Sequence, residues 1–87
     1  DASVARYLKH LAHERRLSAN TLKHYGADLA RLESCAEGAK KSLAQLGEPD
    51  IRRFAAQLHG KGLAARSIAR ILSGWRGYFD FLGKTGS

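Results

Sequence analysis

Apolar side chains recur along the chain at steps of three and four residues, and no segment alternates apolar and polar residues as a β-strand does. This pattern predicts an all-α domain. Four main helices are expected at about residues 3–15, 18–32, 49–60 and 64–82. Between residues 33 and 46 the pattern breaks down, which indicates a turn followed by a short helical return.

Residues with known preferences for helix ends mark these boundaries. Ser18 is a predicted N-cap that accepts a hydrogen bond from the amide of Thr21. Leu17, just before the cap, is expected to pack on Leu22 as a hydrophobic staple. Pro49 suits the first turn of the third helix, where its missing N–H is no loss, and the glycines of "HGKG" are expected to end that helix.

The last predicted helix has two contrasting faces. Its apolar face is the largest in the chain, which marks this helix as the expected centre of the core. Its other face is a strip of basic or small residues joined at steps of three and four. The apolar face consists of Ile68, Ile71, Leu72, Trp75, Phe79 and Leu82, and the strip consists of Arg66, Ser67, Arg70, Ser73, Gly74 and Gly77.

Two glycines so close together in a helix need a reason, because each costs about 1 kcal/mol relative to alanine. One reason is the close approach of a nucleic acid, whose phosphates the arginines would contact while the small residues let the helix settle into a groove. The other is that a neighbouring helix packs on Gly74 and Gly77 while the arginines are solvated. Spacing alone leaves both open.

Composition favours the nucleic acid. The 87 residues carry 15 Lys and Arg against 8 Asp and Glu, a net charge of +7, and such a balance predicts a polyanionic partner. Residues 51–87 hold 7 of the basic side chains and 1 of the acidic ones, so the excess is concentrated toward the last helix. A chain of this length forms one small domain with no room for a large enclosed active site.

A second polar face lies at the start of the second helix, where Asn20, Thr21, Lys23 and His24 project. Helix N-termini offer free amides and a favourable dipole to phosphate, so Ser18, Asn20 and Thr21 are candidates for positioning a nucleic acid. The alternative is that Ser18 only caps the helix and the other side chains are solvated.

No combination of residues predicts catalysis, a metal or a cofactor. His10 and His13 have no nearby cysteine and supply too few ligands for a metal site. No nucleophile falls in a motif beside a base, and "GKTGS" lacks the spacing of a phosphate-binding loop. We therefore expect a fragment without enzyme activity and without a small-molecule ligand. Cys35 is expected to be an ordinary half-buried residue, and a chain with no disulfide framework, membrane span or signal peptide is expected to be cytoplasmic.

Two stretches in order carry a family resemblance. The first, "ERRLSANTLKHYGADL", contains an acidic-basic pair before the pattern L-S-x-x-T-L-x-x-Y-x-x-D-L. The second, "GLAARSIARILSGWRGYFDFL", follows G-L-x-x-x-S-I-x-R-x-L-S-x-x-R-x-F-F-x-F-L, with Trp75 and Gly77 as departures. The chain thus resembles the N-terminal core-binding (SAM-like) domain of a tyrosine recombinase, and it is most similar to the bacterial Xer type.

The resemblance implies a compact bundle of four main helices that forms half of a C-shaped clamp on DNA. In that family the second and fourth helices approach the major groove, and an absent catalytic domain closes the other side. The implied partners are double-stranded DNA, the protein's own catalytic domain and neighbouring recombinase subunits, in chromosome dimer resolution or integration. Tyr78 is not expected to be the recombinase nucleophile, since that residue belongs to the second domain.

Carried over by position, the implied DNA-binding residues fall on two helices. On the second helix, Lys23 and His24 would face the groove, and the three candidates at the start of that helix would lie nearer phosphate. On the last helix, Arg66, Ser67 and Arg70 would face bases or backbone, and Ser73 and Arg76 would contact phosphate. The full set is Ser18, Asn20, Thr21, Lys23, His24, Arg66, Ser67, Arg70, Ser73 and Arg76.

Two other functions stay open from the residues alone: a helix-turn-helix regulator and a helical module that binds an acidic protein. The chain begins at Asp1 rather than methionine and ends in "GKTGS". We therefore expect a piece of a longer protein, with the domain at residues 1–82 and an interdomain linker or cloning remnant at residues 83–87.

Overall fold

The computed structural model describes residues 2–84, and all regular structure in that range is helical. Residues 85–87 of the predicted linker lie outside the described residues. The radius of gyration of 12.7 Å is close to the value of about 12 Å for a folded chain of this size, so the predicted compact four-helix fold is confirmed. The elements are α1 (Ala2–His13), α2 (Ala19–Gly38), the 3₁₀ turn η1 (Leu43–Gln45), α3 (Glu48–Gly60) and α4 (Ala65–Lys84).

Helix α2 is the element whose extent differs most from its prediction. It continues six residues beyond residue 32 because its inner face goes on with small residues, of which Ala36 is buried and Cys35 half-buried. The helix ends at Gly38, and Lys40, two residues later, has a left-handed φ of 58°. The amide of Lys41 donates to the carbonyl of Ala36 at 3.0 Å, so the orphan carbonyls of the last turn are satisfied.

The predicted N-cap of α2 and the predicted start and end of α3 are confirmed. Ser18 Oγ accepts from the amide of Thr21 at 3.2 Å, as expected of an N-cap. Helix α3 carries its proline in the first turn and ends before Gly62, whose φ of 92° suits glycine. Leu17 and Leu22 both pack against the core, and their direct contact stays a prediction.

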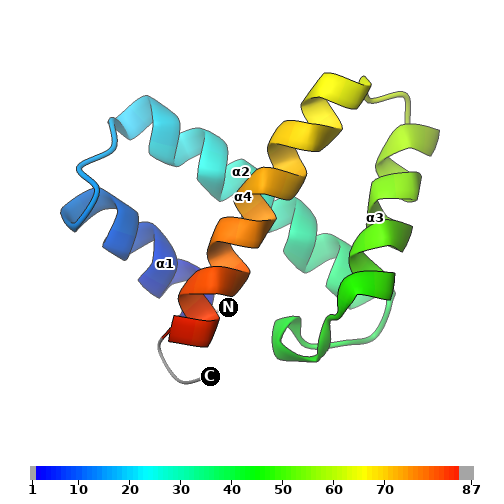
Figure 1. Ribbon diagram of the computed structural model, residues 1–87, viewed down its shortest axis with the longest axis horizontal. Coiled ribbons are helices and arrows are strands. Elements are labelled where there is room, and N and C mark those ends of the chain that lie inside the picture. Colours follow the sequence, from blue (N-terminus) through cyan, green and yellow to red (C-terminus); the bar gives the residue numbers. More distant parts are fainter. Residues whose placement is uncertain (1, 85–87) are drawn as a thin grey trace.

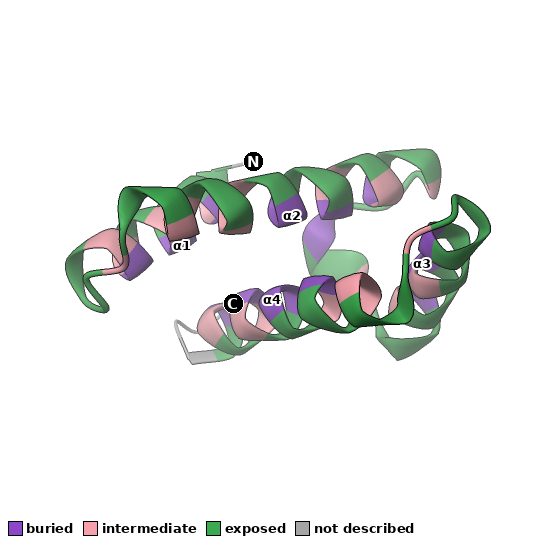
Figure 2. Cartoon of the chain, turned by 90° about the horizontal axis from the view of Figure 1, so that it is seen from above, coloured by how far each residue is buried: buried purple, intermediate pink, exposed green. Residues whose placement is uncertain are grey.

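Helix α4 is the centre of the bundle, as its large apolar face predicted. It crosses α2 near the middle of the molecule, with α1 on one side and α3 on the other, and it contacts all three (Figure 1). Seen from above, the buried positions of α2 and α4 lie between the two helices and the exposed positions lie outside (Figure 2). Within residues 2–84, no helix is both long enough and apolar enough to cross a membrane.

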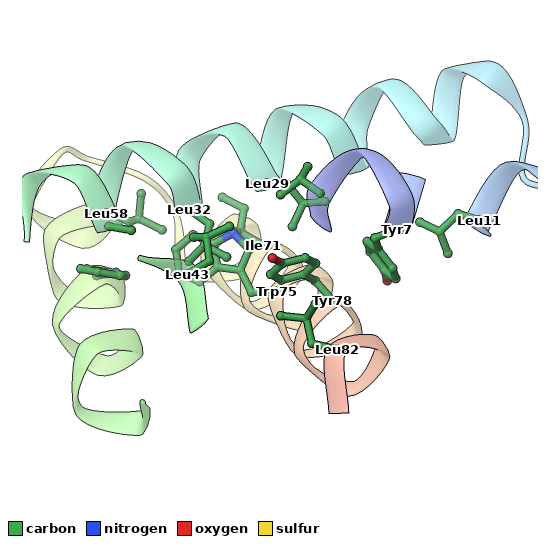
Figure 3. Close-up of a cluster of buried hydrophobic side chains, with 13 residues drawn as sticks. Tyr7, Leu11, Leu29, Leu32, Leu43, Leu58, Ile71, Trp75, Tyr78 and Leu82 are labelled. Atoms are coloured by element: carbon green, nitrogen blue, oxygen red, sulfur yellow. The ribbon is translucent and has the colours of Figure 1, made fainter. Parts of the chain in front are cut away.

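The core is built around aromatic side chains of α4. Trp75 and Tyr78 are fully buried, and they lie among leucines of α2 and α3 (Figure 3). Tyr78 belongs to the core, and its hydroxyl lies 2.5 Å from Ser3 Oγ on α1. The Trp75 ring also meets the edge of Phe54 from α3 at a centroid distance of 6.3 Å. Helix α4 therefore joins the other helices through one contiguous core.

A buried carboxylate fixes the start of α3. Both oxygens of Asp50 accept from Lys41 Nζ, at 2.9 and 3.1 Å, and Oδ2 also accepts from the amide of Gly47 at 2.9 Å. The hydrogen bonds from Lys41 and then from Gly47 hold the pKa of Asp50 below its ordinary value. The charged carboxylate thus ties the loop after α2 to the first turn of α3.

We predict that Asp50→Asn lowers the melting temperature at pH 7 and that the loss shrinks as the pH falls. A carboxyl whose folded pKa is depressed stabilises the fold fully above its unfolded pKa of about 3.9, and this stabilisation disappears as the pH drops through the folded pKa. Thermal melts from pH 7 to pH 3 measure it. The control is Glu48→Gln, which removes a charge from the same turn of α3. Parallel curves for wild type and Asp50→Asn would contradict the prediction.

Candidate nucleic-acid interface

The N-terminal half of α2 and the middle of α4 line one hollow, where the two helices diverge from their crossing point (Figure 1). Its volume is about 480 Å³. We call it the α2–α4 groove. The two polar faces that the sequence singled out separately therefore meet on one surface. The lining residues are Thr21, His24, Tyr25 and Asp28 of α2 and Arg70, Ser73 and Gly74 of α4.

Four of the ten predicted DNA-binding residues line this groove: Thr21, His24, Arg70 and Ser73. The structure places the other six outside its lining. Ser18 is occupied as the cap of α2, where its hydroxyl also donates to Thr21 Oγ1 at 2.9 Å. Asn20 and Lys23 are exposed in the first turns of α2, and Arg66 and Ser67 are exposed and half-buried in the first turn of α4.

Arg76 is separated from the other predicted residues. It lines a different hollow of about 290 Å³, between the start of α3 and the C-terminal half of α4, together with Ile51, Phe79 and Asp80. Asp80 and Glu48, which also lines this hollow, make the local charge less favourable to phosphate. The grouping of Arg76 with the residues of the α2–α4 groove is therefore not reproduced by the fold.

An ion pair that the sequence did not predict crosses the floor of the groove. Arg70 Nη1 donates to Asp28 Oδ2 at 2.8 Å, and the exposed fraction of the side chain is 55% for Arg70 and 6% for Asp28. The indole Nε1 of Trp75 donates to the backbone carbonyl of Asp28 at 2.8 Å. Asp28 is thus tied to α4 through both its side chain and its backbone, and this fixes the distance between the walls of the groove.

The ion pair also fixes the orientation of the Arg70 side chain. Its guanidinium uses one nitrogen for the carboxylate, while the half-exposed side chain leaves other N–H groups accessible from the groove. A signal for Asp28 existed in the sequence, because it lies three residues after Tyr25 and four before Leu32 on the apolar stripe of its helix. An acidic residue in such a stripe requires a buried partner.

The glycines of α4 face other helices, which corrects the interpretation that they admit a nucleic acid. Gly74 is buried, and a Cβ there would lie 3.6 Å from Asp28 Oδ2 and 3.8 Å from the ring of Tyr25. A Cβ on Gly77 would lie only 2.7 Å from the hydroxyl of Tyr7 on α1. Close packing between helices explains both glycines, so the strip on α4 is not one continuous exposed surface.

The positive charge is also distributed more widely than the sequence suggested. The excess in residues 51–87 includes Arg52 and Arg53 on α3 and Lys61 in the turn after it, as well as residues of α4. Within the groove, Asp28 offsets Arg70. One cation was missed: Arg31 is exposed on α2, seven residues after His24 and hence on the same face.

Comparison with known proteins places this fold in a family. Residues 4–86 match the description "Phage integrase, N-terminal SAM-like domain". Similar proteins include the tyrosine recombinase XerC of Ralstonia pickettii, which is 48% identical over 91% of this chain, and that of Pseudomonas aeruginosa, 40% identical over 98%. The same protein of Chromobacterium violaceum is 37% identical over 99%.

The chain spans only part of each of these relatives, between 25% of the Ralstonia protein and 28% of the other two. No solved structure matches the chain. The part that matches is an N-terminal domain, which is not the catalytic one. The predicted resemblance is therefore confirmed: the chain belongs to the family of phage integrase N-terminal SAM-like domains, and it is similar to the corresponding part of XerC tyrosine recombinases.

Proposed function

We propose that this domain binds duplex DNA through the α2–α4 groove and its rim, as one half of a recombinase clamp. In the whole protein it positions the catalytic domain on the DNA for strand exchange, in chromosome dimer resolution or integration. The proposal rests on one observation: two polar helix faces, some forty residues apart in sequence, line a single groove.

The side chains of the groove suit a DNA duplex. Thr21 and Ser73 offer neutral hydroxyl donors, and Arg70 offers a guanidinium that is held in place by its hydrogen bond to Asp28. Such groups bind phosphate oxygens and base edges, and the major groove, about 12 Å wide, admits a helix. Lys23 and Arg66 add exposed positive charge beside the groove, where contacts to the backbone would fix the register of the domain.

The surface favours DNA over the competing hypothesis of a protein-binding module. Protein interfaces are enriched in aromatic and other large apolar side chains. Among the described residues, no large hydrophobic side chain is exposed. The partners that follow from the proposal are double-stranded DNA, the protein's own catalytic domain and neighbouring recombinase subunits.

The proposal predicts that Lys23→Ala combined with Arg66→Ala weakens DNA binding and makes it less dependent on salt. Each lost phosphate contact lowers the slope of log affinity against log salt by about 0.9. The pair is preferable to Arg70→Ala, because both side chains are exposed and neither forms an ion pair with another residue of the described range 2–84. Fluorescence anisotropy with a duplex carrying an inverted repeat, and with a scrambled duplex, measures affinity, slope and site preference.

The matched control is Arg6→Ala combined with Arg52→Ala, which removes the same charge from exposed positions of α1 and α3. We expect this control to bind nearly as wild type does. Equal losses in the two double variants would mean that overall charge rather than the groove determines affinity. An absence of binding even at low salt would reject DNA as the ligand of this domain.

A further inference from the structure

A third hollow, of about 260 Å³, lies between the C-terminal end of α2 and helix α3. We call it the α2–α3 hollow. No acidic residue lines it, and its polar side chains are mainly hydrogen-bond donors. The lining residues are Ser34, Cys35, Gly38 and Ala39 from the end of α2, and Arg53, Gln57 and Lys61 from α3 and the residue after it.

Three of these residues form a regular row along α3. Arg53, Gln57 and Lys61 follow one another at steps of four, so they lie on one face, about 5.4 Å apart per turn along the axis. All three are exposed. The carboxylate of Asp50, three residues before Arg53, pairs with Lys41 and also acts on Arg53, so it offsets part of the charge at that end of the row. Two cations with an amide between them on one helix face can bind successive anionic groups of a polyanion.

A third cation belongs to the same hollow. Burial raises the pKa of the Cys35 thiol, and the positive charges of Lys61 and Arg31 act in the opposite direction. Both cations are therefore close enough to Cys35 to influence it. Arg31 precedes Cys35 by one turn of α2 and is exposed. The hollow is thus surrounded by Arg31, Arg53 and Lys61.

The α2–α3 hollow lies on the same flank of α2 as the α2–α4 groove. His24, Asp28, Arg31, Cys35 and Gly38 follow one another at steps of four and three, which places them on one side of the helix. The first two line the groove and the last two line the hollow, with Arg31 between them. Helix α2 passes behind α4 and continues toward α3, so one helix connects the two sites (Figure 1).

We propose that the α2–α3 hollow is a second phosphate-binding site, at which Arg31, Arg53 and Lys61 contact the backbone of the same duplex that occupies the α2–α4 groove. The proposal rests on the proposed function of the groove. A polyanionic backbone suits the site better than an acidic protein surface, because no large apolar side chain is exposed nearby to bury against a protein. The second site would extend the DNA contact along α2.

The first test is Arg53→Ala combined with Lys61→Ala, assayed by fluorescence anisotropy with the inverted-repeat duplex over a range of salt. Loss of two phosphate contacts should lower the salt slope by about 1.8. Single methylphosphonate substitutions in the duplex, each of which neutralises one phosphate, locate the contacts. The double variant should become insensitive to substitutions that still weaken the binding of the Lys23 and Arg66 double variant.

The thiol of Cys35, the one cysteine of the chain, gives an independent readout. Bound duplex should slow its alkylation by N-ethylmaleimide in the wild type and protect it less in the double variant. Unchanged affinity and slope in the Arg53 and Lys61 double variant, together with weakened binding in the Lys23 and Arg66 double variant, would overturn this inference alone. Absence of DNA binding by the wild type would overturn the proposed function as well.

Discussion

Arg70→Ala should lower the free energy of unfolding by about 1–3 kcal/mol even when no DNA is present. The reason is the carboxylate it leaves behind: Asp28 is 6% exposed, and its Oδ2 would lose its charged donor. A buried charge without a partner is strongly destabilising, by about 3–5 kcal/mol for a fully buried pair. The half-exposed position of Arg70 lets water replace part of the lost interaction, which reduces the effect. Urea unfolding followed by circular dichroism measures it.

A double-mutant cycle separates the ion pair from other effects of the substitution. Arg70→Gln combined with Asp28→Asn should be much more stable than the sum of the single variants predicts, because a neutral pair can keep the hydrogen bond. The interaction energy should be about 0.5–3 kcal/mol, the range for residues in contact. Strictly additive losses would show that the pair contributes nothing and that Asp28 is held by Trp75 alone.

The same pair has a consequence for DNA binding. Arg70→Ala removes a candidate DNA contact and also loosens the connection between α2 and α4, so a loss of affinity in this variant has two causes. Arg70→Lys retains the charge, but a single ammonium lacks the planar fork of a guanidinium. If Arg70 both pairs with Asp28 and contacts DNA, Arg70→Lys should bind DNA more weakly than wild type while unfolding at a similar urea concentration.

Gly77→Ala should destabilise the fold by up to about 2 kcal/mol, although alanine is the better helix former. A Cβ at this position would lie 2.7 Å from the hydroxyl of Tyr7, whose side chain is buried and has little room to move. Overpacking of this kind costs about 1–3 kcal/mol, and the gain in helix propensity returns only about 1 kcal/mol. Thermal or urea unfolding of the variant measures the net effect.

Two variants make this prediction specific. Tyr7→Phe removes the clashing hydroxyl and leaves the next atom, Cζ, at 3.9 Å, so it should rescue Gly77→Ala. Gly26→Ala is the control within a helix, because a Cβ there meets only Leu8 at 3.9 Å and stability should rise by up to about 1 kcal/mol. If Gly77→Ala is as stable as Gly26→Ala, packing does not require the glycine, and close approach of DNA again becomes its explanation.

Local features of the fold were predictable because they depend on residues within about four positions of one another. The periodic apolar positions placed the four helices, and Ser18 with Thr21 placed the start of α2. The extent of α2 was underestimated because its last turns are buried through small residues such as Ala36, which an apolar stripe of leucines does not reveal.

The candidate site was only partly predictable, because it depends on residues that are far apart in the sequence. Sequence identified both polar faces, but it could not show that Thr21, His24, Arg70 and Ser73 share a groove while Arg76 lies in another hollow. That outcome depends on the angle at which α2 and α4 cross, which follows from the packing of the whole core. The cation Arg31 was missed because it stands outside the motifs.

The sequence by itself determined the helical class, the order and caps of the helices and the membership of the recombinase family, since periodicity, capping and motif spacing are properties of the chain read along its length. Only the tertiary structure decided the roles of individual polar and small residues. Asp28 and Arg70 are 42 positions apart, and Gly77 meets a tyrosine at the other end of the chain. Such pairs form only when the hydrophobic core brings distant helices together, so no local pattern reveals them.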